Sequence, residues 1–312
     1  MAARGRLVVV ENSPSEIGLR PLLLASGVTD DELRRLRASE SLTTLRPGAY
    51  LPADDPRLED VFARHVLLVR ATVRKVAPDA VASHASAAVL HGLPLWRTAL
   101  DRVHVTKDRR SGGRRTSLLH VHVAALDGDE IVEVDGVAVT SVARTVADLA
   151  RSESFEQALV PADAALHRHL VVPDDLTDAV GRGAHRSGTP RARRVIAFAD
   201  AGSMSPGETL SRLAIHRAGL PPPVLQYEIP GTGAEVDFWW PMFRTAGEFD
   251  GRAKYGRLLA PEQTAADAVV AEKIREDRVR DEQVGVVRWT WDELPPRFAP
   301  VVARIRASFD RA

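Results

Sequence analysis

The stretch EVDFWWPMFRTAGEFDG, residues 235–251, decides how the last third of the chain folds. Apolar and polar residues alternate through Glu235–Trp240 and again through Phe243–Asp250, and Pro241-Met242 separates the two runs. Successive side chains of a strand point to opposite faces of a sheet. The alternation therefore predicts two neighbouring strands joined by a turn, with one aromatic face and one acidic face.

Three carboxylates can share the acidic face: Asp237, Glu248 and Asp250. Whether Asp237 lies beside Glu248 depends on the strand register, which the sequence does not determine. Clustered carboxylates repel one another, and a divalent cation is the usual reason to gather them. Mg2+, with Mn2+ as the alternative, prefers oxygen ligands and can activate water for phosphodiester hydrolysis. We therefore expect these three residues to be metal ligands and catalytic residues, with Lys254 orienting the water or contacting the phosphate.

Several of these residues also have a purely structural interpretation. Ser205-Pro206-Gly207-Glu208 is typical of a helix start, with serine as the N-cap, so Glu208 can be a capping residue rather than a catalytic one. Asp237 can be a polar position on an exposed sheet face, and Lys254 can simply be solvated. The segments that follow predict a long charged helix over Glu262–Val284, a strand over 286–291 and a closing helix from Pro300.

Five separated motifs in this region occur in the order of a known family. They are Ser205-Pro206-Gly207-Glu208, Val236-Asp237-Phe238, Glu248-Phe249-Asp250-Gly251 with Lys254-Tyr255, Glu272-Lys273 with Asp277-Arg278, and Val286-Val287-Arg288. Residues 203–295 thus resemble the very-short-patch-repair-like endonuclease domain of the PD-(D/E)XK superfamily. The resemblance implies a restriction-endonuclease-like α/β fold, with Glu208, Asp237, Glu248 and Asp250 as metal-side acids. The superfamily places a lysine where this chain has Asp250, so Lys254 or Lys273 would have to replace it.

The first 56 residues have the pattern of a winged helix-turn-helix. A leucine-rich segment ends at Gly27, Thr29–Glu32 resembles a capping box at the start of a basic helix, and a turn at Arg46-Pro47-Gly48 separates two short strands. The alternative is a small helical cap with a solvated basic face.

Residues 57–200 predict an α+β domain. The pattern indicates an amphipathic helix over 57–76, a helix capped by Ser83, three strands over 102–107, 118–125 and 137–140, and four further helices. The loop between the first two strands is strongly basic, and its arginines can be solvated or can contact phosphate. These candidates are Arg109, Arg110, Arg114 and Arg115.

A second resemblance covers the front of the chain. Residues 27–51, 83–93 and 140–149 together resemble the AbiEi-type antitoxin and regulator architecture, in which a winged helix precedes an α+β domain. The resemblance implies DNA binding by the first domain, with Arg34, Arg35, Arg37 and Arg46 as the contacts. An antitoxin of this type would have a cognate toxin of the nucleotidyltransferase type as its protein partner.

Histidines and one charged pair complete the list of candidates. His120 and His122 alternate on a strand and can share a metal ion, although no third ligand stands near them in sequence. His84 and His91 are better explained by packing or capping. Arg144 and Asp148 have the i,i+4 spacing of a salt bridge on a helix.

Composition narrows the class of protein without naming a function. At roughly 150 residues each, 312 residues amount to about two domains, and three small ones also fit. From the sequence pattern we place three domains at 1–56, 57–200 and 201–312. Lys plus Arg equals Asp plus Glu at 42 each, so no global charge points to nucleic acid or membrane. The absence of cysteine excludes disulfides and thiolate metal sites. No apolar run reaches the roughly 18 residues of a membrane span, which predicts a cytoplasmic protein without a membrane partner.

Two functional hypotheses follow from these patterns. The first is a DNA-associated α+β multidomain protein whose last domain is a Mg2+-dependent endonuclease. The second is a non-enzymatic DNA-binding regulator or antitoxin that carries a degenerate nuclease fold.

Overall fold

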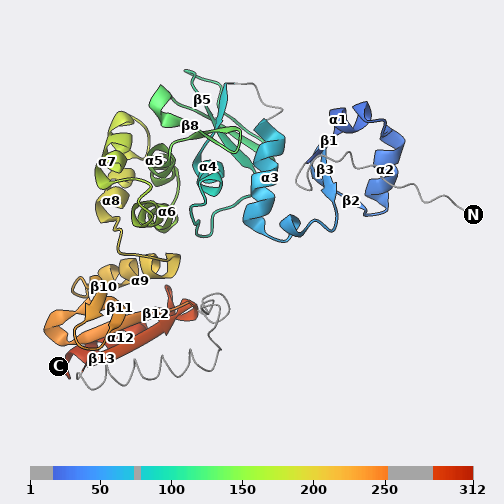
Figure 1. Ribbon diagram of the computed structural model, residues 1–312. Helices are drawn as coiled ribbons and strands as arrows, with labels where there is room; N and C mark the ends of the chain where they lie inside the picture. The colour runs from blue at the N-terminus through green and yellow to red at the C-terminus, as the bar shows by residue number, and fades with distance from the viewer. Residues whose placement is uncertain (1–16, 74–78, 252–283, 312) are drawn as a thin grey trace, which may run out of the picture. The chain divides into compact units, whose positions relative to one another are not determined.

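The computed structural model describes residues 17–73, 79–251 and 284–311, which form a mixed α+β structure with three sheets (Figure 1). The chain divides into two compact units. Unit 1 comprises Met1–Leu93 and Arg97–Leu149, and unit 2 comprises Pro94–Trp96 and Ala150–Ala312. The boundaries expected near residues 56 and 200 lie inside these units.

Unit 1 begins with two short helices and a three-stranded antiparallel sheet of order β1-β3-β2. Gly27, with φ of +96°, makes the turn between the helices, and the Thr29 hydroxyl accepts a hydrogen bond from the Glu32 amide at 3.2 Å. The expected order of helix, tight turn, helix and hairpin is therefore present, but the second helix, expected to be basic, carries three acids beside its three arginines. The elements are β1 (Gly18–Leu19), α1 (Arg20–Ala25), α2 (Asp30–Ala38), β2 (Leu42–Arg46) and β3 (Ala49–Pro52).

The second part of unit 1 is a six-stranded mixed sheet of order β6-β7-β5-β4-β9-β8. Strands β5 and β7 are parallel neighbours in the sheet. The chain that connects them runs back in the opposite direction and includes β6, a short strand that pairs with the outer side of β7 at the sheet edge. The strands are β4 (Ala80–Ala82), β5 (Val103–Lys107), β6 (Arg114–Arg115), β7 (Leu119–Val123), β8 (Ile131–Val134) and β9 (Val137–Thr140). Helices α3 (Val61–Val73) and α4 (His84–Leu90) accompany the sheet, and α5 (Val142–Ser152) follows it.

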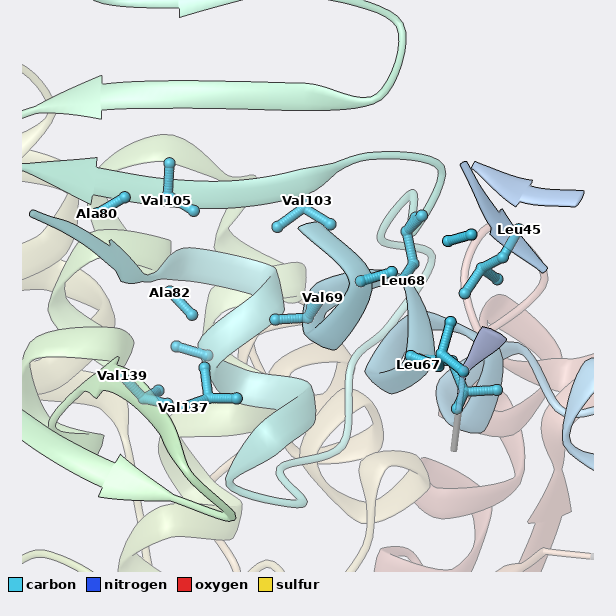
Figure 2. Close-up of a cluster of buried hydrophobic side chains, with 14 of the residues drawn as sticks. Leu45, Leu67, Leu68, Val69, Ala80, Ala82, Val103, Val105, Val137 and Val139 are labelled. Atoms are coloured by element: carbon cyan, nitrogen blue, oxygen red, sulfur yellow. The ribbon is translucent and has the colours of Figure 1, made fainter. Parts of the chain in front are cut away.

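Helix α3 supplies the centre of the unit 1 core. Figure 2 shows Leu67, Leu68 and Val69 among apolar side chains of β4, β5 and β9, with Leu45 of the hairpin beside them. The helix begins at Val61, later than the sequence predicts, because residues 56–58 form a 3-10 turn and the Asp60 carboxylate accepts hydrogen bonds from two amides of the first helical turn.

Unit 2 combines helices with a four-stranded sheet of order β10-β11-β12-β13. The first three strands are antiparallel, and β13 is parallel to β12. The helix expected over Glu262–Val284 lies, except for its last residue, outside the described residues. The elements are α6 (Phe155–His167), α7 (Pro173–Arg182), α8 (Thr189–Phe198), α9 (Pro206–Arg217), β10 (Val224–Ile229), β11 (Ala234–Trp240), β12 (Thr245–Asp250), β13 (Gly285–Thr290) and α12 (Ala299–Phe309).

One face of this sheet packs against α9 and α12. Phe238 and Trp289 of the sheet are fully buried with Ile215 of α9 and Ile305 of α12. Helix α9 approaches so closely that a Cβ at Gly207 would lie 1.9 Å from the ring of Phe249. A larger residue at this position cannot fit without movement of the aromatic side chain, so the glycine of the SPGE motif is a packing requirement.

A buried ion pair connects α6 with α9. Asp163 is completely buried and accepts hydrogen bonds from Arg212 at 2.8 Å and from the Thr209 hydroxyl at 2.9 Å. The Asp200 amide donates to the other carboxylate oxygen at 2.9 Å.

Across the described residues, we find no helix with the length and apolarity needed to cross a membrane.

Candidate functional site

The carboxylates singled out in the sequence lie on the sheet of unit 2. Strands β11 and β12 pair Phe238 with Gly247 and Trp239 with Ala246, and Asp237 and Glu248 are the next residues of the two strands beyond the last pair. Because side chains alternate, Asp237, Glu248 and Asp250 then share the face opposite the one covered by α9 and α12. All three acids thus lie on one side of the sheet, although the pairing of β11 with β12 ends before Asp237.

Neighbouring groups fix two of these carboxylates. Asp237 Oδ2 accepts a hydrogen bond from the Phe249 amide at 2.7 Å. Glu248 Oε2 accepts from Arg288 Nε at 2.6 Å, and Arg288 is the register partner of Glu248 on β13. The acidic face therefore includes a cation that the sequence pattern did not assign to it. The sequence indicates only that Arg288 alternates with the apolar Val287 and Trp289 and so faces away from the core. It does not indicate that Arg288 meets Glu248, because strand pairing joins these residues across 40 positions of the chain.

Glu208 has the structural role that its position in the SPGE motif predicts. Its Oε1 accepts from the Ser205 hydroxyl at 2.7 Å, and its Oε2 accepts from the Met204 amide at 2.9 Å and from Gln226 Nε2 at 2.8 Å. The side chain is buried, at 5% exposure. Glu208 thus joins the start of α9 to strand β10, and both of its oxygens already accept hydrogen bonds.

The chemistry of the donors on the acidic face fits a hard cation. Mg2+ retains several waters and needs only one or two protein carboxylates, which Asp237 and Glu248 can supply. Among the described residues, His84, His104 and His122 of unit 1 bring their ligand atoms within 4.8 Å of one another. Asp237, Glu248 and Asp250 do not form a group this tight. Lys254 and Lys273 lie outside the described residues.

The candidate DNA contacts of the first helices are mostly exposed. Arg34 pairs with Asp31 at 2.7 Å, and Arg35 and Arg37 also face solvent on α2. Arg46, at the end of β2, differs from them. Its Nε and Nη1 atoms are buried and have no hydrogen-bond acceptor among the described residues, and burial lowers the pKa of its guanidinium.

The basic loop divides into paired and unpaired arginines. Arg109 and Lys107 both bind the carboxylate of Asp79, and these hydrogen bonds lower the pKa of Asp79 to about 2. Arg110, Arg114 and Arg115 are exposed and make no ion pair within the described ranges. Arg114 and Arg115 form the edge strand β6, where they are held in place by pairing with β7.

His84 and His104 form a cluster with His122, which the sequence pattern did not predict. His104 lies on the neighbouring strand β5 and His84 begins helix α4, so the third ligand that is absent nearby in sequence comes from other elements. Burial lowers the pKa of His104 to about 4 and also lowers the pKa values of His120 and His122, which keeps these rings neutral at pH 7.

Comparison with known proteins places the chain among mycobacterial relatives. No family model matches it. Two proteins of Mycobacterium tuberculosis, "Uncharacterized protein MT2308" of strain CDC 1551 / Oshkosh and "Uncharacterized protein Rv2248" of strain ATCC 25618 / H37Rv, are each 32% identical to it over 241 residues, covering 75% of this chain and 82% of the relative. The chain belongs to their family.

The names of these two relatives state no activity. Among solved structures, the crystal structure of the RV2827C protein from Mycobacterium tuberculosis aligns with a TM-score of 0.36 and 15% identity, over 63% of this chain and 71% of that chain.

Proposed function

We propose that the protein acts on DNA, with unit 1 binding the duplex and the acidic face of unit 2 hydrolysing phosphodiester bonds with a divalent cation. The observation that carries this proposal is the alternation of side chains on β11 and β12, which puts Asp237, Glu248 and Asp250 on one face of the sheet, with Asp237 and Glu248 directly beyond the last paired residues. The resemblance to the very-short-patch-repair-like endonuclease domain supports the same assignment.

Asp237 and Glu248 are the residues that would hold the cation, with Asp250 beside them. A bound Mg2+ or Mn2+ would supply an activated water and stabilise charge on a phosphoryl oxygen. The chain's own contribution is to orient the acids. The Phe249 amide holds Asp237, and Arg288 holds Glu248 while placing a positive charge where a phosphate would approach.

The DNA-binding part of the proposal relies on Arg46 and on the exposed arginines of unit 1. A buried guanidinium edge without an acceptor is costly, and phosphate oxygens are the acceptors that arginine binds best. Because Arg46 Nε and Nη1 are closed to solvent, DNA bound at the hairpin would supply these oxygens to them only if the side chain moves outward on binding. Arg34, Arg35 and Arg37 of α2 would add contacts to the phosphate backbone.

Nicking of supercoiled plasmid tests the nuclease assignment. Parent protein with Mg2+ or Mn2+ should nick the plasmid, and Asp237→Asn and Glu248→Gln should each lower the rate by at least about 100-fold, as expected for loss of a group that stabilises the transition state. Glu228→Gln, the same type of change at an exposed acid of β10, is the matched control and should leave the rate unchanged. If the two site variants nick as well as the parent, the assigned site is wrong.

A second candidate function is a DNA-binding regulator or antitoxin without enzymatic activity. Three observations favour it: Glu248 is ion-paired with Arg288, Glu208 is engaged in capping, and Asp250 stands where the superfamily has a lysine. Footprinting on DNA upstream of its own coding region, in chelator, distinguishes the two functions. Protection without metal, together with no nicking in Mg2+, would support the regulator. Co-purification with a nucleotidyltransferase-like toxin encoded next to it would support the antitoxin.

A further inference from the structure

Four histidines gather on one side of the six-stranded sheet of unit 1. The parallel register of β5 and β7 sets His104 beside His120, and His122 follows two residues later on the same face. His84, the first residue of α4, stacks on His122 with a centroid distance of 3.6 Å. Val103 and Val105 alternate with His104 and enter the apolar core, so the imidazoles lie on the opposite face of the strand.

The nitrogen atoms of three of these rings converge. His104 Nδ1 lies 3.1 Å from His122 Nε2, and one ligand atom from each of His84, His104 and His122 falls within 4.8 Å of the others. In a tetrahedral zinc site, with Zn–N bonds of about 2.0–2.1 Å, ligand nitrogens lie roughly 3.3 Å apart. The His104–His122 spacing is therefore close to that of two imidazoles bound to one ion.

A hydroxyl group behind the cluster can set the tautomer of His84. Ser83 Oγ accepts from the Thr106 hydroxyl at 2.8 Å and lies 3.0 Å from His84 Nδ1. When Nδ1 donates to Ser83, Nε2 of His84 is the nitrogen that can bind an ion, and metal-bound histidines commonly use an oxygen acceptor in this way. Ser83 and Thr106 are completely buried.

The backbone of His84 is held in a strained conformation. Its φ of +52° lies in the left-handed region, which costs a residue with a Cβ about 1–2 kcal/mol. The surrounding structure fixes this residue at 8% exposure and turns its ring onto His122. Such strain collects at functional sites, where the position of a side chain matters more than local stability.

We propose that His84, His104 and His122 bind one transition-metal ion of the zinc class, with water at the fourth position. An all-imidazole set suits Zn2+, Cu2+ or Ni2+ rather than Mg2+, so this site is independent of the acidic face in unit 2. His104 and His122 are half-buried, which gives an ion access from solvent. Because the two rings are stacked nearly parallel, binding requires the His84 side chain to rotate out of its stack with His122 while the His84 backbone stays in place. His120 packs on His122 at 3.8 Å between centroids but does not coordinate the ion.

Metal titration of the full chain, expressed without a histidine tag and stripped with chelator, tests the site. We expect one equivalent of Co2+ to produce the visible absorption bands of tetrahedral cobalt and one equivalent of Zn2+ to abolish them. His104→Gln and His122→Gln should each weaken Zn2+ binding by at least about 100-fold in calorimetry.

His120→Gln is the matched control, because it removes an imidazole from the same cluster without removing a ligand, and it should change affinity by less than about threefold. Asp237→Asn should keep the cobalt spectrum, which separates this site from the proposed nuclease site. Absence of stoichiometric Co2+ binding to the parent, or an equal loss in His120→Gln, overturns the proposal. The parent titration alone decides the matter if a ligand variant does not fold in chelator.

Discussion

Arg144 and Asp148 form an almost completely buried ion pair one helical turn apart, with Arg144 Nε 2.9 Å from Asp148 Oδ2. The same guanidinium donates to Glu130 at 2.7 Å and to the Ala125 carbonyl at 3.0 Å. Arg144 therefore joins α5 to the segment that precedes β8, and its charge is balanced by two carboxylates.

Replacing Arg144 should destabilise unit 1 strongly. In Arg144→Met, Glu130 and Asp148 keep their charges in a buried position without the cation, and removing one partner of a buried pair costs about 3–5 kcal/mol. Urea unfolding followed by circular dichroism measures the loss. Arg34→Met removes an exposed i,i+3 pair on α2, so it is the control and should change the free energy of unfolding by less than about 1 kcal/mol.

Gly207 and Phe249 should behave as a coupled pair. Gly207→Ala forces a methyl group against the Phe249 ring and should cost about 1–3 kcal/mol. In the double variant with Phe249→Leu, the smaller side chain makes room, so the combined destabilisation should be smaller than the sum of the two single values by about 0.5–3 kcal/mol. Strict additivity in the double-mutant cycle would show that the ring moves aside freely.

Stability should fall as the pH drops below neutrality because of His65. Its Nδ1 faces the Leu100 carbonyl at 3.0 Å, which can only accept, so Nδ1 carries the proton and Nε2 accepts from Ser86. Burial lowers the pKa of His65 below the ordinary 6.5. The unfolded chain then binds more protons than the folded chain below pH 6.5, so stability is fully present above that pH and is lost on acidification.

The expected slope is at most about 1.4 kcal/mol per pH unit for each such histidine. Urea midpoints measured in chelator between pH 8 and 5 should fall with pH, and His65→Gln should fall less steeply. Equal slopes in the two proteins would mean that His65 titrates normally in the folded state.

Arg46→Met should stabilise the protein while weakening DNA binding. The substitution removes buried guanidinium nitrogens that have no acceptor within the described residues, which should raise the free energy of unfolding by about 1 kcal/mol. If phosphate is the missing acceptor, affinity for duplex DNA should fall by about tenfold, measured by fluorescence anisotropy. A variant that is less stable and binds DNA normally would contradict both statements.

The basic loop should determine part of the salt dependence of DNA binding. Neutralising Arg110, Arg114 and Arg115 together should reduce the slope of log affinity against log salt by about 0.9 for each phosphate that the loop no longer neutralises. Arg109→Gln is the control, because Arg109 is already paired with Asp79. An unchanged slope in the triple variant would remove this loop from the interface.

Local features were predictable because their causes lie within a few residues. Thr29 and Ser205 cap helices as their sequence context predicts, and Arg144 pairs with Asp148 one turn away. The strands around Asp237 and Glu248 could be read from their alternation, because a two-residue period is a local property.

Features that depend on strand pairing could not be read from the sequence. The partner of Glu248 is 40 residues away, and His104 and His84 reach His122 only through the order of strands β4, β5 and β7. Ser83 shows a related limit. It occupies the N-cap of α4 as expected, but its hydroxyl contacts His84 and Thr106 rather than capping the helix, because buried polar neighbours compete for it.

The parallel pairing of β5 with β7 has an evolutionary consequence. The chain must travel back between the two strands, and it does so through residues 108–118, outside the row of imidazoles. Changes within residues 108–113 should leave His104 in register with His120, because neither paired strand includes these residues. Selection can therefore tune Arg109 and Arg110 for one ligand without disturbing the histidines, whereas Arg115 lies opposite His120 and is tied to them.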